Sequence, residues 1–314
     1  MPSSVGSFLK LIRYPNLIFI VLTQLGLHYL VVLPILRDAQ IASSLNHLDV
    51  ALLILSTVLI AAGGYIINDY FDVQIDRVNK PDRVYIDRTI KRRVAILIHQ
   101  VFSGIAVLIG VYLAWKVGNL KLMFIQPIVI GFLWFYSTGY KKQPLTGNIV
   151  VAFLTAFVVL IVGLYQTSLF RDPNAAYGAY AVFVRLFFYF VFAFLVSVMR
   201  EIVKDMEDVE GDERFGSRTL PILYGISKTK YIVYGVAAVT FVLVAWVQYS
   251  RFVYNDYLTI IYLLQTLQVP LGVIVWQLYV SDSPKHFRRV STLIKLLMLM
   301  GIFSMAYLYF LYTY

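Results

Sequence analysis

An amide and three carboxylates follow a long apolar stretch of the sequence, and all four side chains carry oxygen atoms that can bind a metal ion. They are Asn68, Asp69, Asp72 and Asp76. Asn68, Asp72 and Asp76 recur at every fourth residue and Asp69 lies three residues before Asp72, so a helix would present all four on roughly one side. The spacing therefore predicts a stripe of oxygen ligands at the end of an apolar helix.

Four more carboxylates follow a second apolar stretch with a similar spacing: Glu201, Asp205, Asp208 and Asp212. Each cluster alone could be a solvated helix end whose acids pair with nearby basic residues. Two such clusters facing each other would repel strongly where water is partly excluded, so we expect a cation between them. Magnesium is the natural candidate, because it binds one or two carboxylates per site, keeps some waters and takes phosphate oxygens as further ligands.

The composition predicts an integral membrane protein. The 314 residues are 60% hydrophobic and 14% charged, whereas soluble domains have about 45–50% apolar and about 25% charged residues. We expect no cleavable signal peptide, because the first residues lack a basic stretch followed by a short apolar core. The absence of cysteine excludes disulfides, thiolate metal sites and a cysteine nucleophile, and leaves the redox compartment undetermined.

Nine apolar stretches have about the length needed to cross about 30 Å of hydrocarbon. They lie at 17–36, 50–67, 94–115, 122–140, 149–169, 182–199, 231–249, 257–280 and 290–312. We expect an all-α polytopic protein whose nine helices surround a central cavity capped on the cytoplasmic side. We expect a single domain, in which 11–140 and 147–280 could be two related four-helix halves followed by a ninth helix.

The charged residues predict the orientation of these helices. With nine spans and a cytoplasmic N-terminus, most of the 27 Lys and Arg residues fall on the cytoplasmic side, as membrane proteins prefer. The net charge of +10 therefore indicates membrane orientation, and we expect no nucleic-acid partner. Most of the 17 acids lie in two cytoplasmic segments, 69–87 and 201–213, beside many basic residues. These acidic and basic residues at one face of the membrane could bind a diphosphate, the acids through metal ions and the basic residues directly.

Further candidates lie close to the two acidic clusters in the sequence. Arg83 follows the first cluster on a turn and could bind phosphate, and Lys141 could do the same or simply mark the cytoplasmic end of a span. Asn16 is either part of a helix start or a residue that lines the site. Tyr65 and Tyr136 could present ring faces to a developing positive charge.

The sequence resembles the UbiA superfamily of intramembrane aromatic and lipid prenyltransferases. The resemblance lies in three segments: 68–76 (NDYFDVQID) with the turn 79–83 (NKPDR), 204–212 (KDMEDVEGD) with 218–221 (RTLP), and 136–148. They are most similar to the branch of digeranylgeranylglyceryl phosphate synthase, chlorophyll synthase and homogentisate prenyltransferase. The family often continues after the NKPDR turn with a proline and a glycine turn, whereas this chain has Val84 to Arg88.

The resemblance implies an enzyme that moves a polyprenyl group, such as geranylgeranyl, from its diphosphate to a lipophilic acceptor and releases diphosphate. It implies two Mg2+ ions and a membrane lipid environment. The implied metal ligands are Asn68, Asp69, Asp72, Asp76, Asp205, Asp208 and Asp212, of which all but Asp69 are also counted as catalytic. The implied substrate-binding residues are Asn16, Tyr65, Arg83, Tyr136, Lys141 and Lys204.

Several alternatives remain open at this stage. The acceptor could be geranylgeranylglyceryl phosphate in ether-lipid synthesis, or the aromatic ring or tetrapyrrole of a quinone or chlorophyll pathway. A cation-coupled transporter also needs carboxylates, but near the bilayer midplane on broken helices, and here they lie at helix ends. A CDP-alcohol phosphotransferase also uses aspartates and magnesium, but its Asp-Gly and Ala-Arg elements are missing and nine spans are too many.

Overall fold

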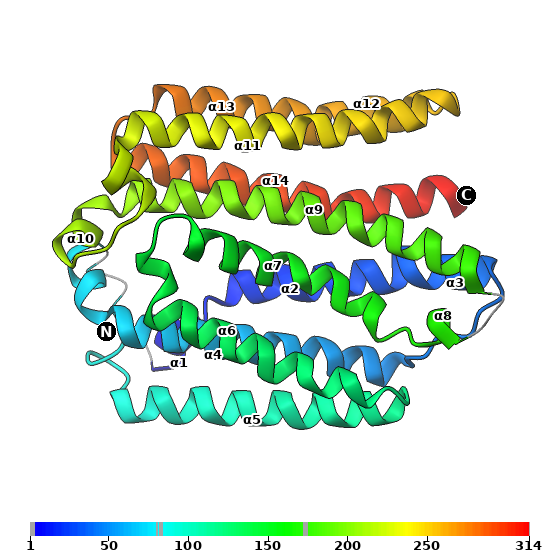
Figure 1. Ribbon diagram of the computed structural model, residues 1–314, viewed down its shortest axis with the longest axis horizontal. Coiled ribbons are helices and arrows are strands. Elements are labelled where there is room, and N and C mark those ends of the chain that lie inside the picture. The colour runs from blue at the N-terminus through cyan, green and yellow to red at the C-terminus, as the bar shows by residue number, and fades with distance from the viewer. Residues whose placement is uncertain (1–3, 80, 82–83, 172–174, 314) are drawn as a thin grey trace. The chain divides into compact units, whose positions relative to one another are not determined.

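A computed structural model describes residues 4–79, 81, 84–171 and 175–313. In this part of the chain, nine helical segments are long and apolar enough to cross a membrane. This finding confirms the predicted all-α membrane fold. The segments are α2–η1–α3 (Tyr14–Asp38), α4 (His47–Asn79), α5 (Arg92–Lys116), η3–α6 (Leu120–Thr138), α7 (Thr146–Leu164), α9 (Ala176–Glu207), α11 (Leu220–Val253), α12–η6–α13 (Tyr257–Val280) and α14 (Pro284–Thr313) (Figure 1).

Several helices extend well beyond the apolar stretches that the sequence predicts. Helix α4 continues past the predicted end at residue 67 and ends at Asn79, and α11 begins at Leu220 instead of 231. The extensions carry polar residues, which a hydropathy pattern excludes although they are helical. Shorter elements connect the spans: α1 (Ser4–Leu11), η4 (Tyr140–Lys142), α8 (Ser168–Arg171) and α10 (Val209–Arg214).

Two of the membrane-spanning segments contain a π-helical turn shortly before a proline. The first turn is η1 (Leu27–Val32), which is followed by Pro34 in α3 (Leu33–Asp38). The second is η6 (Leu264–Gln268), which is followed by Pro270 in α13 (Val269–Val280). Proline cannot donate a backbone hydrogen bond to the preceding turn, and a local widening of the helix accommodates the change.

The chain forms two compact units that are described separately. The first comprises Met1–Tyr140 and Phe157–Phe187, and the second comprises Lys141–Ala156 and Phe188–Tyr314. Helices α7 and α9 therefore each contribute residues to both units. The predicted division into halves at 11–140 and 147–280 remains a prediction.

In the first unit, α4 packs against α2, α5 and α6. Small residues permit the close approach: a Cβ atom on Gly64 would lie 3.0 Å from Leu133 of α6, and one on Gly63 would lie 3.3 Å from His99 of α5. The ring of His99 donates a hydrogen bond from Nδ1 to the carbonyl oxygen of Gly63 at 3.0 Å. Close packing and interhelical hydrogen bonds are what hold helices together in lipid.

A buried polar contact lies in the same unit. Gln126 of α6 donates a hydrogen bond from Nε2 to the hydroxyl of Tyr165 at 3.0 Å, and both side chains are buried. The Gln126 amide also lies against Gly110 of α5, where a Cβ atom would come within 2.3 Å of it. Helix α5, helix α6 and the segment at Tyr165 therefore all pack around the buried amide of Gln126.

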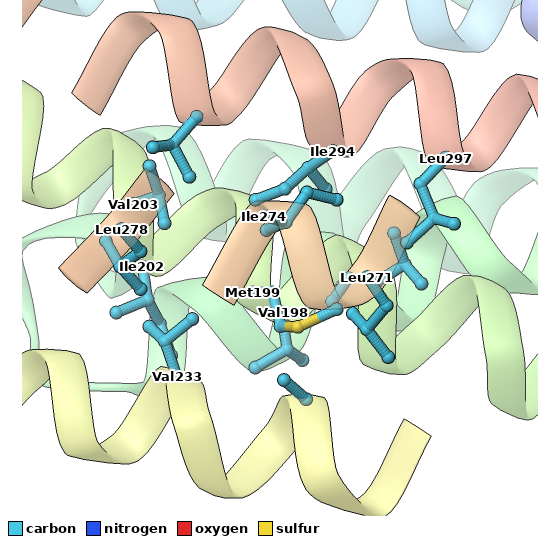
Figure 2. Packing of buried hydrophobic residues seen from close by; sticks show 14 of the residues in the cluster. Val198, Met199, Ile202, Val203, Val233, Leu271, Ile274, Leu278, Ile294 and Leu297 are labelled. Atoms are coloured by element: carbon cyan, nitrogen blue, oxygen red, sulfur yellow. The ribbon is translucent and has the colours of Figure 1, made fainter. Parts of the chain in front are cut away.

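The second unit has a separate apolar core (Figure 2). Met199 and Ile202 of α9, Ile274 of α13 and Ile294 of α14 are at most 1% exposed, and Val233 of α11 packs with them. This core holds the end of α9 that carries the second acidic cluster.

We predict that Tyr165→Phe destabilises the protein. The substitution leaves the buried amide of Gln126 without its hydrogen-bond partner, which costs about 1–3 kcal/mol in free energy of unfolding. Tyr177→Phe is the matched control, because its side chain is 79% exposed. Thermal unfolding in detergent should show a clear loss for Tyr165→Phe alone, and equal midpoints for the two variants would contradict the role of this contact.

Candidate functional site

The first acidic cluster lies on the last turns of α4, as the spacing predicts. Asn68, Asp69, Asp72 and Asp76 are all half-buried within this continuous helix. Asn68 donates a hydrogen bond from Nδ2 to Oδ2 of Asp72 at 2.9 Å. The amide thus orients a carboxylate one helical turn away without changing its charge.

The start of α2 holds the neighbouring Asp69 in place. Arg13, which lies between α1 and α2, donates from its guanidinium to Oδ1 of Asp69 at 2.7 Å. The same guanidinium lies 4.9 Å from the ring centre of Tyr65, and Asn16 donates a hydrogen bond to the Tyr65 hydroxyl at 3.1 Å. Asn16 and Tyr65, both predicted site residues, are therefore neighbours.

Arg13 keeps its positive charge in this position. Burial alone lowers the pKa of its guanidinium, but attraction by Asp69 and the hydrogen bond to that carboxylate contribute to a net pKa above the ordinary value. Its backbone has a φ of 52°, in the left-handed region that residues other than glycine rarely adopt. This conformation turns the chain between α1 and α2, and the ion pair and the tyrosine ring hold the side chain there.

The second acidic cluster is divided between two helices, although its spacing predicts one. Helix α9 ends at Glu207, Asp208 has a φ of −102° and a ψ of 9°, and α10 begins at Val209. Asp205 therefore lies on α9, Asp208 at the break and Asp212 on α10. All three are half-buried.

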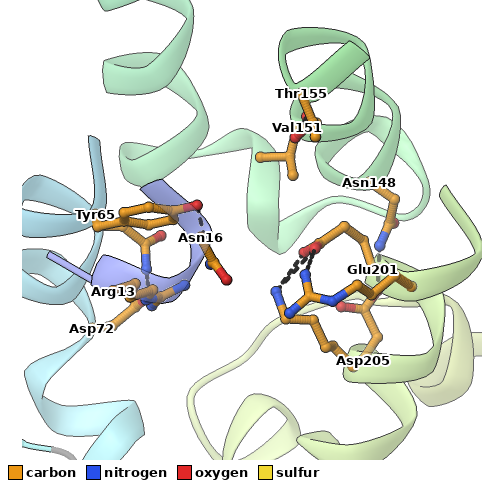
Figure 3. A network of polar contacts seen from close by, with 12 residues as sticks. Arg13, Asn16, Tyr65, Asp72, Asn148, Val151, Thr155, Glu201 and Asp205 are labelled. Atoms are coloured by element: carbon orange, nitrogen blue, oxygen red, sulfur yellow. Dashed lines mark hydrogen bonds and ion pairs between the residues drawn. The ribbon is translucent and has the colours of Figure 1, made fainter. Parts of the chain in front are cut away.

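Glu201 and Asp205, at the end of α9, have hydrogen-bond partners of different kinds (Figure 3). Glu201 accepts hydrogen bonds from Arg200 at 2.9 Å and from Lys204 at 2.8 Å, so cations surround it. Asp205 instead accepts a hydrogen bond at 2.8 Å from the amide of Asn148, near the start of α7. Lys204, predicted to bind substrate, thus contacts an acid of its own helix.

The other predicted residues lie on different elements. Tyr136 is half-buried near the end of α6 in the first unit, and Lys141 is half-buried in η4 in the second unit. Arg83 lies outside the residues that the structure describes.

The first cluster has the donor atoms that magnesium requires. Oδ1 of Asn68 is buried and accepts no hydrogen bond from the described residues, and the carboxylates of Asp72 and Asp76 lie on the same helix. Buried polar atoms normally have partners, so this buried oxygen suits a cation. In the part of the chain that is described, no three acids or histidines converge on one point. Magnesium requires only one or two carboxylates from a protein and completes its shell with water and phosphate.

Three of the contacts that shape these clusters are not predicted from the sequence. The start of the first span at Arg13 and Asn16 reads as an ordinary helix start in the sequence, and neither Asn148 nor the ion pair between Arg288 and Glu207 at 2.8 Å is assigned a role there. Only Asn148 could have been identified from the sequence, because it lies in the segment 136–148 that resembles the UbiA family.

The two acidic clusters place half-buried carboxylates at the ends of apolar helices. This chain is therefore an intramembrane protein with candidate metal-binding acids at its helix ends. The chain matches the sequence model of the UbiA prenyltransferase family over residues 31–300. It is 31% identical over 265 residues to digeranylgeranylglyceryl phosphate synthase of Thermococcus sibiricus, an alignment that covers 81% of this chain and 82% of that one. This chain belongs to the UbiA prenyltransferase family, as its motifs predict.

Solved structures confirm the fold. One, which concerns digeranylgeranylglyceryl phosphate synthase in membranes, has a TM-score of 0.61 at 24% identity and covers 96% of this chain and 97% of its own. Another is a UbiA homologue from Archaeoglobus fulgidus bound to DMAPP and Mg2+, with a TM-score of 0.57 at 17% identity, covering 95% of this chain and 98% of its own.

We predict that Arg13 and Asp69 are energetically coupled. In a double-mutant cycle of Arg13→Gln and Asp69→Asn, the coupling energy should be about 0.5–1 kcal/mol, because the Arg13 side chain is 36% exposed and the pair is partly screened. The free energy of unfolding in mixed micelles measures it. Strictly additive effects would show that the ion pair does not hold α2 to α4.

Proposed function

We propose that this protein transfers a geranylgeranyl group from its diphosphate to geranylgeranylglyceryl phosphate within the membrane and releases diphosphate. Membership of the UbiA prenyltransferase family supports the reaction class. The relatives named digeranylgeranylglyceryl phosphate synthase support the acceptor. The observation that carries the proposal is the ligand stripe at the end of α4, with the buried Asn68 oxygen beside two carboxylates.

We further propose that both acidic clusters bind magnesium, one ion at each. The residues that would hold the ions are Asn68, Asp69, Asp72, Asp76, Asp205, Asp208 and Asp212. When bound, magnesium stabilises the negative charge that develops on the diphosphate as the allylic carbon–oxygen bond breaks. Mg2+ in a homologous solved structure supports the choice of metal.

The chain's own polar and basic residues bind and orient the donor. Lys141, Lys204 and Arg83 would neutralise diphosphate oxygens, with Lys204 exchanging its contact with Glu201 for the ligand. The bond to the allylic carbon breaks with its electron pair leaving on the diphosphate. The acceptor hydroxyl then supplies an electron pair to that carbon, forms an ether bond and gives up its proton to the released diphosphate.

Aromatic rings and apolar helices suit the cationic stage of this reaction. The face of Tyr65 already lies near the positive charge of Arg13, at 4.9 Å from the ring centre. Ring faces at Tyr65 and Tyr136 would stabilise a developing allylic cation by about 0.5–2 kcal/mol each. Asn16 keeps Tyr65 in place through its hydroxyl. The apolar spans would hold the prenyl chain and exclude water from the cation.

The distribution of basic residues supports the orientation of the protein. We place the N-terminus and both acidic clusters at the cytoplasmic side, because the long basic segments adjoin the clusters and basic residues favour that side. A water-soluble diphosphate product would then leave into the cytoplasm.

We predict that Asp72→Asn and Asp208→Asn each reduce diphosphate release by about 100-fold or more, because each removes charge that stabilises the transition state. The unfolding midpoint in detergent should stay close to that of the wild type. Asp38→Asn, at an exposed aspartate, is the matched control. Chelation should stop release reversibly on re-addition of Mg2+. Wild-type rates in both cluster variants would refute the assignment.

We predict a single preferred donor and acceptor pair. Membranes that contain the protein are incubated with labelled geranylgeranyl, farnesyl or longer diphosphates and with geranylgeranylglyceryl phosphate, a quinone-precursor ring or a chlorin. Mass spectrometry should identify a lipid with a second geranylgeranyl ether. Labelling of a ring or chlorin instead would keep the reaction class and replace the acceptor.

A further inference from the structure

The contact between Asn148 and Asp205 joins two helices of the second unit. Asn148 lies in the first turn of α7, is 6% exposed and donates from Nδ2 to Oδ2 of Asp205 on α9 at 2.8 Å (Figure 3). The two residues are 57 positions apart in the sequence. The fold therefore brings an amide to one particular carboxylate of the acidic cluster.

Neighbouring acids on the same helix have partners of a different kind. Glu201 is bound by the cations of Arg200 and Lys204, and Glu207 by the guanidinium of Arg288 at 2.8 Å. Those contacts compensate the charge of the acids. The amide of Asn148 is a neutral donor, so it orients one oxygen of Asp205 without compensating the negative charge.

The same hydrogen bond could serve only to hold α7 against α9. A carboxylate is energetically unfavourable for that purpose. A half-buried carboxylate with a neutral partner is costly in its charged form, and an amide or hydroxyl in its place would avoid that cost. Either a proton or a bound cation removes the cost, but only binding to a cation requires the second oxygen to be held in one orientation. Carboxylates that bind metals are typically hydrogen-bonded by such outer partners.

We propose that Asn148 is a positioning residue, which fixes the Asp205 carboxylate so that its second oxygen binds a divalent cation. This inference rests on the proposed function, because the cation is the one proposed there. It adds a residue that never touches substrate or metal and acts only through Asp205.

The test measures metal binding separately from activity. Asn148→Leu keeps the branched shape of the side chain, in a larger form, and removes the donor. Thr155→Val is the matched control on the same helix, since the Thr155 hydroxyl donates only to the Val151 carbonyl at 2.8 Å. Binding of Mn2+ to the full-length protein in detergent, without donor, is followed by electron paramagnetic resonance, and the unfolding midpoint without metal is recorded for each variant.

Asn148→Leu should weaken Mn2+ binding about 10–100-fold, and the midpoint without metal should stay near that of the wild type. Diphosphate release should recover at high Mg2+. Thr155→Val should bind as the wild type does. A lowered midpoint with unchanged Mn2+ affinity would overturn the inference and leave a structural tie.

A double-mutant cycle keeps the inference testable if Asn148→Leu folds poorly. In an Asp205→Asn background, replacing Asn148 with Leu or Ser should not weaken Mn2+ binding any further. An additional loss there would overturn the inference, because Asn148 would then act without Asp205. If the wild-type protein bound no Mn2+, the proposed function would fail as well; wild-type binding with an unaffected Asn148→Leu would refute the positioning role alone.

Discussion

The cost of placing carboxylates against apolar helices determines how both acidic clusters are built. A charged group near hydrocarbon requires a partner, and the protein supplies partners of two kinds. Asp69, Glu201 and Glu207 are each bound by a cationic side chain. Asp72 and Asp205 each accept a hydrogen bond from a neutral amide.

This division separates acids that are paired with cationic side chains from acids that are bound by a neutral amide. The ion pair of Asp69 fastens the start of α2 to the end of α4, and the ion pair of Glu207 fastens the end of α9 to the start of α14. The amides instead restrict the rotation of a carboxylate without neutralising it. In each unit, an asparagine therefore orients one aspartate of the acidic cluster.

Much of the fold could be predicted from the sequence, because the length of an apolar stretch determines whether a helix can span a membrane. The stripe on α4 was also predictable, since residues four apart share a face of any continuous helix. The break at Asp208 was not, because a spacing compatible with a helix does not require one. The pairing of Arg13 with Asp69 across 56 positions and of Asn148 with Asp205 across 57 depends on tertiary packing, which local spacing does not encode.

The distribution of α7 and α9 over both units has a consequence for biogenesis. The nascent chain emerges from its N-terminus, so residues 141–156 of the second unit are synthesised before 157–187 complete the first. Tyr165 and Gln166 supply partners to Gln126 and to Ser43 only at that stage. The early helices therefore enter the membrane before the buried amide of Gln126 has its Tyr165 partner, whereas Ser43 already bonds to Leu45 within the early chain.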